Sequence, residues 1–513
     1  MINIKKYDLF ELSLENIRGA GLVEQAALFE QNGIKINVPA FRAGKDRYLV
    51  RFMPQKTGVW RYTVNVGGQT EEGTFNCIEN TENHGPVHPE GHHFRYADGT
   101  RYIPFGTTCY AFVHQTEALQ QKTLETLKQS PFNKIRLCVF PKHMPYNHND
   151  PDFYPFHTDA DGKWDVRDPD ERYWQNLETR IRQLADLHME ADLILFHPYD
   201  RWGFSNLGRD NDLAYLRYCI ARLASYKNVW WSLANEYDLM LNKDFEDFDL
   251  FGELIAAEDP YHHPISVHNC LLVYPKRDWM THCSIQSGDI NHVIKWQQEY
   301  DLPILIDECG YEGDIPYNWG NLSAFEMTHR FWWTLMRGGY CTHGETFHRE
   351  DEVLWWAKGG VLYGKSPQRI RFLRELMEGI PETMTPMKGL GLLNPNDPDS
   401  AAENREEDDF RKAFMRAMGR LPKEAQTRFI LDQIPMMLQS ENHQLSYYGR
   451  TCPSFTHLQL PTNGKYRVEL LDIWEMTRET IDETACGEIR VSLPGREGAA
   501  ILITRLEGES LIR

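Results

Sequence analysis

The pattern of hydrophobic and polar positions differs between three parts of this chain. Over residues 1–82 apolar and polar positions alternate, as in YLVRFMP and GVWRYTVNV, with the turn QKTG between them. A period of two is typical of strands that bury one face. We therefore expect a small N-terminal β-sandwich, which ends in the Pro-, Gly- and His-rich linker TENHGPVHPEG.

Residues 83–390 show a different pattern, in which short apolar runs end in polar residues and alternate with amphipathic stretches such as YWQNLETRIRQLADLHME. The runs cover 101–110, 133–141, 192–198, 229–236, 264–269, 284–289, 303–308 and 338–345. Eight alternating βα units over roughly 300 residues are what a closed parallel barrel requires. The pattern predicts an α/β fold, a (β/α)8 TIM barrel, as the catalytic domain.

The pattern changes again after the barrel. Residues 391–425 are expected to form a linker and a helix, with Phe410, Phe414 and Met418 on one helical face. Over residues 426–513, runs such as YRVELLDIW and AAILITRLE alternate like short antiparallel strands. They predict a small C-terminal β-sandwich, so the barrel is flanked by two β-domains.

Composition narrows the classes of partner. The 513 residues carry a formal net charge of −19, and an acidic surface disfavours nucleic acid as the main ligand. No long apolar stretch predicts a membrane span, and the first residues lack the apolar core of a signal peptide. The ten scattered cysteines contain no CxxC pair and suit reduced thiols. We expect a cytoplasmic protein, and self-association stays open.

The ends of two predicted strands carry the candidate chemistry. VWWSLANE ends in Asn235 and Glu236, and PILIDE ends in Asp307 and Glu308. A carboxylate at the end of a buried strand is costly unless it faces a polar cleft. Strands four and seven of an eightfold ring face each other across the mouth, where one carboxylate can protonate a glycosidic oxygen while the other attacks carbon or activates water. Ion pairing at the barrel rim is the alternative.

These two motifs resemble those of the large superfamily of retaining glycoside hydrolases, which carry catalytic glutamates on strands four and seven. Nearly the whole chain is similar to bacterial glycosidases with an N-terminal Ig-like domain of unknown function, a cellulase-like barrel and a C-terminal β-domain. The segments that carry this resemblance are FRAGKDRYLVRFMPQKTGVWRYTV, FHPYDRWGF, WSLANE, ILIDECGYEG and CTHGETF. The resemblance implies double displacement without a cofactor, with Glu236 as the acid/base and Glu308 as the nucleophile.

The resemblance also implies two supporting roles. Asn235 binds the 2-hydroxyl of the sugar, and Arg136 on strand two keeps the nucleophile ionised unless it is a structural barrel residue. One departure concerns strand six, where SIQSGD lacks the His-x-Tyr whose tyrosine contacts the nucleophile in many members of the superfamily.

Other strand ends offer further candidates for substrate binding. His197 can bind a hydroxyl or be a satisfied core histidine, and Trp202 is the best candidate to stack on a sugar. His343 and Glu345 are expected to bind sugar or support the nucleophile. The pairs of adjacent histidines lack a third ligand at suitable spacing, so no metal site is predicted.

Two rival functions stay open. A barrel lyase or aldolase needs a lysine Schiff base or a divalent metal, and Lys142 is the one lysine just past a strand end. A non-catalytic carbohydrate-binding protein could also use a degenerate glycosidase barrel, although both glutamates are present. For the leading hypothesis, the lack of a secretion signal favours short oligosaccharides or glycosides as substrates.

Overall fold

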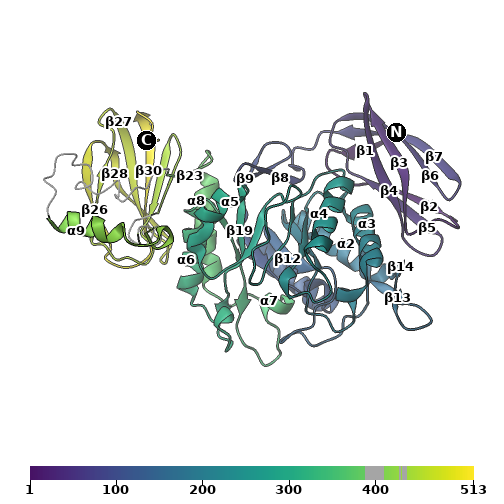
Figure 1. The fold of residues 1–513 in the computed structure, drawn as a ribbon. Coiled ribbons are helices and arrows are strands. Elements are labelled where there is room, and N and C mark those ends of the chain that lie inside the picture. Colours follow the sequence, from purple (N-terminus) through teal and green to yellow (C-terminus); the bar gives the residue numbers. More distant parts are fainter. Residues whose placement is uncertain (388–408, 427–428, 430–435, 513) are drawn as a thin grey trace. The chain divides into compact units, whose positions relative to one another are not determined.

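The computed structural model describes residues 1–387, 409–426, 429 and 436–512 (Figure 1). The predicted linker therefore lies mostly outside the described residues. The chain divides into two compact units. The first holds the N-terminal sheet and seven complete barrel strands together with the end of the eighth, and the second holds helices α6 (Ala324–Leu335) and α8 (Ser366–Gly379) and the C-terminal β-domain.

Eight parallel strands form the central sheet and confirm the predicted barrel. Their order is β17-β16-β15-β12-β11-β21-β19-β18. The strands are β11 (Gly106–Thr108), β12 (Lys134–Cys138), β15 (Glu190–Phe196), β16 (Val229–Ala234), β17 (Ile265–Ser266), β18 (Cys283–Gln286), β19 (Ile304–Glu308) and β21 (Tyr340–His343). A parallel bridge between His268, just past β17, and Ser284 in β18 joins the two ends of this order, so the sheet closes.

Helices follow the first four barrel strands in turn: α1 (Glu117–Gln129), α2 (Glu171–Asp186), α3 (Arg209–Leu223) and α4 (Phe245–Glu258). Helix α2 begins where the Asp170 side chain accepts a hydrogen bond from the Arg172 amide, which satisfies a free N–H of the first turn. Its buried face includes Trp174, Leu177 and Ile181, at the spacing of one helical stripe. The sequence periodicity thus sets which face of the helix is buried.

The N-terminal domain is a seven-stranded sheet in the order β1-β7-β6-β3-β4-β5-β2. The strands are β1 (Ile2–Lys5), β2 (Phe10–Glu15), β3 (Val23–Gln31), β4 (Ile34–Arg42), β5 (Arg47–Phe52), β6 (Gly58–Val66) and β7 (Gln69–Ile78). Phe10 of β2 stacks on Phe75 of β7 with ring centroids 4.6 Å apart, although these strands are far apart in the sheet order. The sheet therefore folds over its own aromatic core, which is the layered β-domain predicted.

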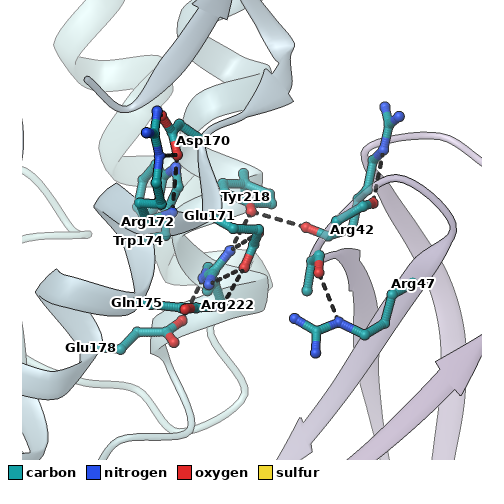
Figure 2. A network of polar contacts seen from close by, with 12 residues as sticks. Arg42, Arg47, Asp170, Glu171, Arg172, Trp174, Gln175, Glu178, Tyr218 and Arg222 are labelled. Carbon is teal, nitrogen blue, oxygen red and sulfur yellow. Dashed lines mark hydrogen bonds and ion pairs between the residues drawn. The ribbon is translucent and has the colours of Figure 1, made fainter. Parts of the chain in front are cut away.

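Buried polar contacts join this sheet to the barrel helices within the first unit. Arg51 of β5 pairs with Glu178 of α2 at 2.5 Å and donates to the carbonyl of Arg222 at 2.8 Å. Figure 2 shows Arg222 of α3 bonded to Glu178 and the Tyr218 hydroxyl reaching the carbonyl of Arg42 at 2.9 Å. Ions this deeply buried need partners, and here each domain supplies partners for the other.

The C-terminal domain is also all-β, as predicted. A six-stranded sheet has the order β23-β24-β25-β30-β27-β28, and β26 and β29 form a separate pair. The strands are β23 (Thr385–Pro386), β24 (Met436–Gln439), β25 (His443–Tyr447), β26 (Phe455–Gln459), β27 (Gly464–Asp472), β28 (Thr477–Ala485), β29 (Glu488–Ser492) and β30 (Ala499–Gly508). Leu458 and Val491 of the pair share one core with Tyr466 and Ile501 of the sheet, so two layers pack together.

Two further observations concern helices. Within the second unit, His329 of α6 contacts the hydroxyl of Tyr447 in β25 at 2.9 Å, which ties a barrel helix to the C-terminal sheet. Helix α9 (Asp409–Met418) carries the predicted face, on which Phe410 stays exposed and Met418 is buried. Among the described helices, none combines the length and the apolar character that crossing a membrane requires.

Candidate active site

Glu236 and Glu308, the two predicted catalytic glutamates, share one bridging side chain. Glu236 lies two residues past β16, and Glu308 ends β19. With its amide oriented to satisfy both carboxylates, Gln286 of β18 donates from Nε2 to Glu308 Oε2 at 3.2 Å and to Glu236 Oε1 at 3.1 Å. One nitrogen at these distances holds the two oxygens no more than about 6.3 Å apart. The structure therefore brings the two carboxylates into one site.

Three polar side chains surround the carboxylate of Glu308. The Tyr110 hydroxyl donates to Oε1, Arg136 Nη1 lies 3.7 Å from the same oxygen, and His268 Nε2 lies 3.9 Å from it. Burial and then the charge of Glu236 raise the pKa of Glu308, while Arg136 opposes that rise. Two carboxylates this close in a buried site tend to retain a proton between them, which makes one of them an acid and leaves the other an anion.

The backbone at Glu236 is strained. Its φ of +51° lies in the left-handed region, which costs a non-glycine residue about 1–2 kcal/mol. The turn comes directly after the fully buried strand β16 and opens the short helix η3 (Tyr237–Leu239). The Tyr199 hydroxyl donates to Glu236 Oε2. This turn presents the carboxylate to Gln286, and a strained backbone held by its surroundings is a recurring feature of active sites.

A buried ion cluster lies among the barrel strands next to the glutamates. Lys134 Nζ lies 2.6 Å from Asp192 Oδ2 and 3.1 Å from Asp307 Oδ1, and Arg136 Nε lies within 4.0 Å of both aspartates. Burial alone raises the pKa of Asp307, but Lys134 and Arg136 outweigh burial and hold it well below its usual range. The two cations thus balance the two aspartates and fix the guanidinium that reaches Glu308.

Lys142 lies between the two tyrosines that donate to the glutamates. Its Nζ is 3.4 Å from the ring centroid of Tyr110 and 4.2 Å from that of Tyr199. A cation over an aromatic face is stabilised by the negative charge of that face. Burial lowers the pKa of Lys142, while Cys138 and the nearby charges of Glu236 and Glu308 act to raise it. The ammonium group links both sides of the site.

The predicted supporting residues Asn235 and Arg136 are also brought together. Asn235 Oδ1 accepts a hydrogen bond from Arg136 Nη2 at 3.1 Å and lies 3.2 Å from the Tyr110 hydroxyl. Both side chains are buried. This contact fixes the orientation of the Asn235 amide beside the glutamates.

Two other predicted residues have contacts of their own. His197 is buried, its Nε2 contacts the carbonyl of Phe140 at 3.1 Å, and burial followed by the charge of Lys142 lowers its pKa to about 4. Trp202 is half-buried, and its indole N–H donates to Asp150 at 2.9 Å. Sugar binding by His197 or Trp202 stays a prediction.

His343 and Glu345 lie in a second buried group together with Glu312. The ligand atoms of these three residues lie within 4.8 Å of one another. The ring of His343 stacks on Phe132 at 4.7 Å, and Glu345 accepts the backbone N–H of Tyr363 at 2.5 Å. A role of His343 and Glu345 in substrate binding stays a prediction.

Sequence reasoning missed three residues that surround the glutamates, Tyr110, Tyr199 and Gln286, and it named Lys142 only for a rival lyase or aldolase. Tyr110 ends the first predicted apolar run, and Tyr199 lies inside the segment FHPYDRWGF. Gln286 lies on strand six, where the expected tyrosine is missing. The signal available was their position at strand ends, because such residues meet at one face of a barrel.

Comparison with protein families matches residues 88–379 to the family described as apiosidase-like, catalytic domain. The flanking segments 3–67 and 433–504 match two families described as domains of unknown function, DUF5060 and DUF5605. A search of curated proteins found no match.

Two solved structures named as glycoside hydrolases are similar to this chain. A crystal structure of a candidate glycoside hydrolase from Bacteroides vulgatus is 32% identical, with 99% of this chain and 100% of that chain covered and a TM-score of 0.84. A family 5 glycoside hydrolase from the same organism is 14% identical, with 82% and 94% covered and a TM-score of 0.60. At that lower identity the similarity concerns the fold alone.

Proposed function

The chain belongs to the apiosidase-like family of glycoside hydrolases, and from this premise we propose that it cleaves O-glycosidic bonds with retention of configuration. Glu308 is the nucleophile and Glu236 is the acid/base. The reaction is a double displacement that needs no cofactor. The substrate is a glycoside or an oligosaccharide, with an apioside as the first candidate because of the family to which the barrel belongs.

The observation that carries this proposal is the single amide of Gln286 between the two carboxylates. Retaining enzymes hold their carboxyl groups about 5–5.5 Å apart, whereas inverting enzymes hold them about 6.5–9.5 Å apart to admit a water molecule. The limit of about 6.3 Å between the two bonded oxygens is compatible with the close pair of a retaining enzyme. Arg136 and Tyr110 favour an anion at Glu308, against the rise in its pKa that burial and Glu236 cause.

In the first step Glu308 attacks the anomeric carbon, and the bond between that carbon and the leaving oxygen breaks. Glu236 gives its proton to the leaving oxygen, so the aglycone departs as an alcohol. The electron pair of the Glu308 carboxylate forms the covalent glycosyl-enzyme. The amide of Asn235, held by Arg136 and Tyr110, donates to the 2-hydroxyl of the sugar.

In the second step the ionised Glu236 takes a proton from water. The resulting hydroxide attacks the anomeric carbon from the face that the aglycone left, and Glu308 is released as a carboxylate. Two inversions restore the original configuration. Glu236 again carries the proton, which closes the cycle.

The first test is a screen of 4-nitrophenyl glycosides, including the β-D-apioside, with the wild type and three variants. We expect one glycoside to release 4-nitrophenol, and Glu308→Ala to lose at least about 10⁴-fold in kcat. Glu350→Ala, an exposed glutamate in the loop after the last barrel strand, is the control and keeps wild-type turnover. Near wild-type turnover by both Glu236→Ala and Glu308→Ala excludes these residues as catalysts.

The second test separates the two roles by azide rescue. Glu236→Ala still forms the glycosyl-enzyme when the leaving group is a good phenol, and azide then gives a glycosyl azide of retained configuration. Glu308→Ala forms no covalent intermediate, so azide enters directly and gives the inverted anomer. NMR of the glycosyl azide determines its anomeric configuration. If the two variants give the opposite configurations, the roles of Glu236 and Glu308 are reversed.

A further inference from the structure

A line of aromatic side chains runs from the site of the two glutamates to the protein surface. Tyr110, which donates to Glu308, has its ring centroid 5.8 Å from that of Trp356. Trp356 lies 4.9 Å from Trp319, and Trp319 stacks on Tyr317 at 5.4 Å with an interplanar angle of 7°. We call Trp356, Trp319 and Tyr317 the aromatic row.

Exposure rises steadily along the aromatic row. Trp356 is 4% exposed, Trp319 is 38% exposed and Tyr317 is 44% exposed. Trp319 is the most exposed of the fourteen tryptophans, all of which lie in the described residues. A large apolar surface left in water beside a catalytic site is a signature of ligand binding, because it is costly to maintain without one.

The segment that carries Trp319 and Tyr317 is held in place. Tyr311 donates its N–H to the carbonyl of Trp319 at 2.6 Å, and Gly320 donates its N–H to the carbonyl of Tyr317 at 2.8 Å. Gly320 packs so closely on Ile315 that an added Cβ would lie 2.5 Å from it. The rings are therefore placed before a ligand arrives, which reduces the entropy that binding loses.

We propose that the aromatic row is a binding subsite for further sugar residues of the substrate. This proposal rests on the proposed function, because the aromatic row can bind substrate only if Glu308, with which it is continuous, belongs to the active site. The C–H face of a sugar ring is apolar and packs on the face or edge of an aromatic ring, while its hydroxyls stay in water. The substrate is then a glycan chain of several residues rather than an isolated glycoside, and its chain extends along Trp319 and Tyr317.

Binding is tested on protein that carries Glu308→Ala, so that no turnover occurs. Isothermal titration calorimetry uses hexamers of β-1,4-linked glucose, xylose and mannose and of galacturonic acid. We expect one hexamer to bind and Trp319→Ala or Tyr317→Ala to weaken its binding by about 3- to 10-fold. Phe245→Ala, whose 43% exposed ring lies at the start of α4 against Tyr237, leaves binding unchanged.

Equal binding by the Trp319→Ala and unsubstituted proteins overturns the proposal, and so does the absence of binding by every hexamer. The aryl-glycoside screen tests the proposed function separately. A failure of the subsite can therefore be told apart from a failure of the proposed function. For the active enzyme, Trp319→Ala lowers kcat/KM several-fold further on the hexamer than on the 4-nitrophenyl glycoside, mainly through KM. An equal loss on both substrates contradicts a subsite for additional sugars.

Discussion

Lys142 places a positive charge beside both proposed catalytic carboxylates. Its charge opposes the rise in the pKa of Glu308 that burial and Glu236 cause. Lys142→Met removes that charge, so the carboxylate becomes easier to protonate and the acid limb of kcat/KM moves to higher pH, by about one unit. A pH–rate profile on the aryl glycoside measures the shift. Lys142→Arg keeps the charge and the wild-type acid limb, whereas an unmoved limb in Lys142→Met contradicts this role.

The Tyr110 hydroxyl donates to Glu308 and lies 3.2 Å from Asn235 Oδ1. Tyr110→Phe removes this hydrogen bond and keeps the ring that packs on Trp356, so the fold is expected to persist. A hydrogen bond to a charged group contributes about 1.5–3 kcal/mol, which corresponds to a loss of about 10- to 100-fold in kcat/KM. Tyr215→Phe is the matched control, because that buried phenol donates to the carbonyl of Leu195. Similar losses in both variants would point to a general effect on the barrel.

At the level of elements, the sequence predicts the barrel strands better than the contacts among them. Strand β16 is buried along its whole length and appears as an apolar run that stops at polar residues, whereas the equally buried β15 also contains Glu190 and Asp192. Gln286 could not be predicted as a bridge, because its two contacts come from β19 and from the turn after β16. Those contacts depend on how the sheet closes, and closure leaves no local pattern in the sequence.

The contact between β5 and α2 gives a prediction about stability. Glu178 is buried and pairs with Arg51 and Arg222. Glu178→Gln removes the charge and leaves two buried guanidinium groups with weaker partners, which costs about 3 kcal/mol of unfolding free energy. Urea unfolding followed by far-UV circular dichroism measures the loss. Glu258→Gln removes the more exposed pair with Arg217 and is expected to cost less than about 1 kcal/mol.

The stabilisation that Glu178 provides depends on pH, and the pKa of Glu178 gives the sign of that dependence. Burial raises the pKa of Glu178, but Arg222 and Arg51 outweigh burial, so the pKa of the folded state is lower than that of the unfolded chain. The stabilisation is therefore present above the unfolded pKa and is lost as pH falls through the folded value. The difference between wild type and Glu178→Gln is expected to shrink in acid, and a constant difference contradicts the ionic account.

At the level of the whole molecule, alternation and βα periodicity predicted the types of the three domains correctly. They did not predict how the N-terminal sheet attaches to the barrel. Arg51, Glu178 and Arg222 come from three distant segments, and no motif links them. Their pairing follows only from the packing of β5 against α2 and α3, which local propensity does not determine.

The ten cysteines give a prediction that covers every domain. Seven are buried: Cys77, Cys109, Cys138, Cys219, Cys283, Cys309 and Cys341. Burial raises the pKa of Cys138 to about 12, and a protonated thiol is a poor nucleophile. In native protein only the exposed Cys452 and Cys486 are expected to react quickly with 5,5′-dithiobis(2-nitrobenzoate).

Cys270 is the informative exception in that titration. It is half-buried, and burial together with the charge of Glu236 raises its pKa to about 12, so it reacts more slowly than the two exposed thiols. Because it lies beside Glu236, a glycoside bound at the site is expected to slow its reaction further, while Cys452 reacts at an unchanged rate. Denatured protein that was never reduced should release ten equivalents of thionitrobenzoate. A count of eight or fewer reveals a disulfide and overturns the prediction of a reducing compartment.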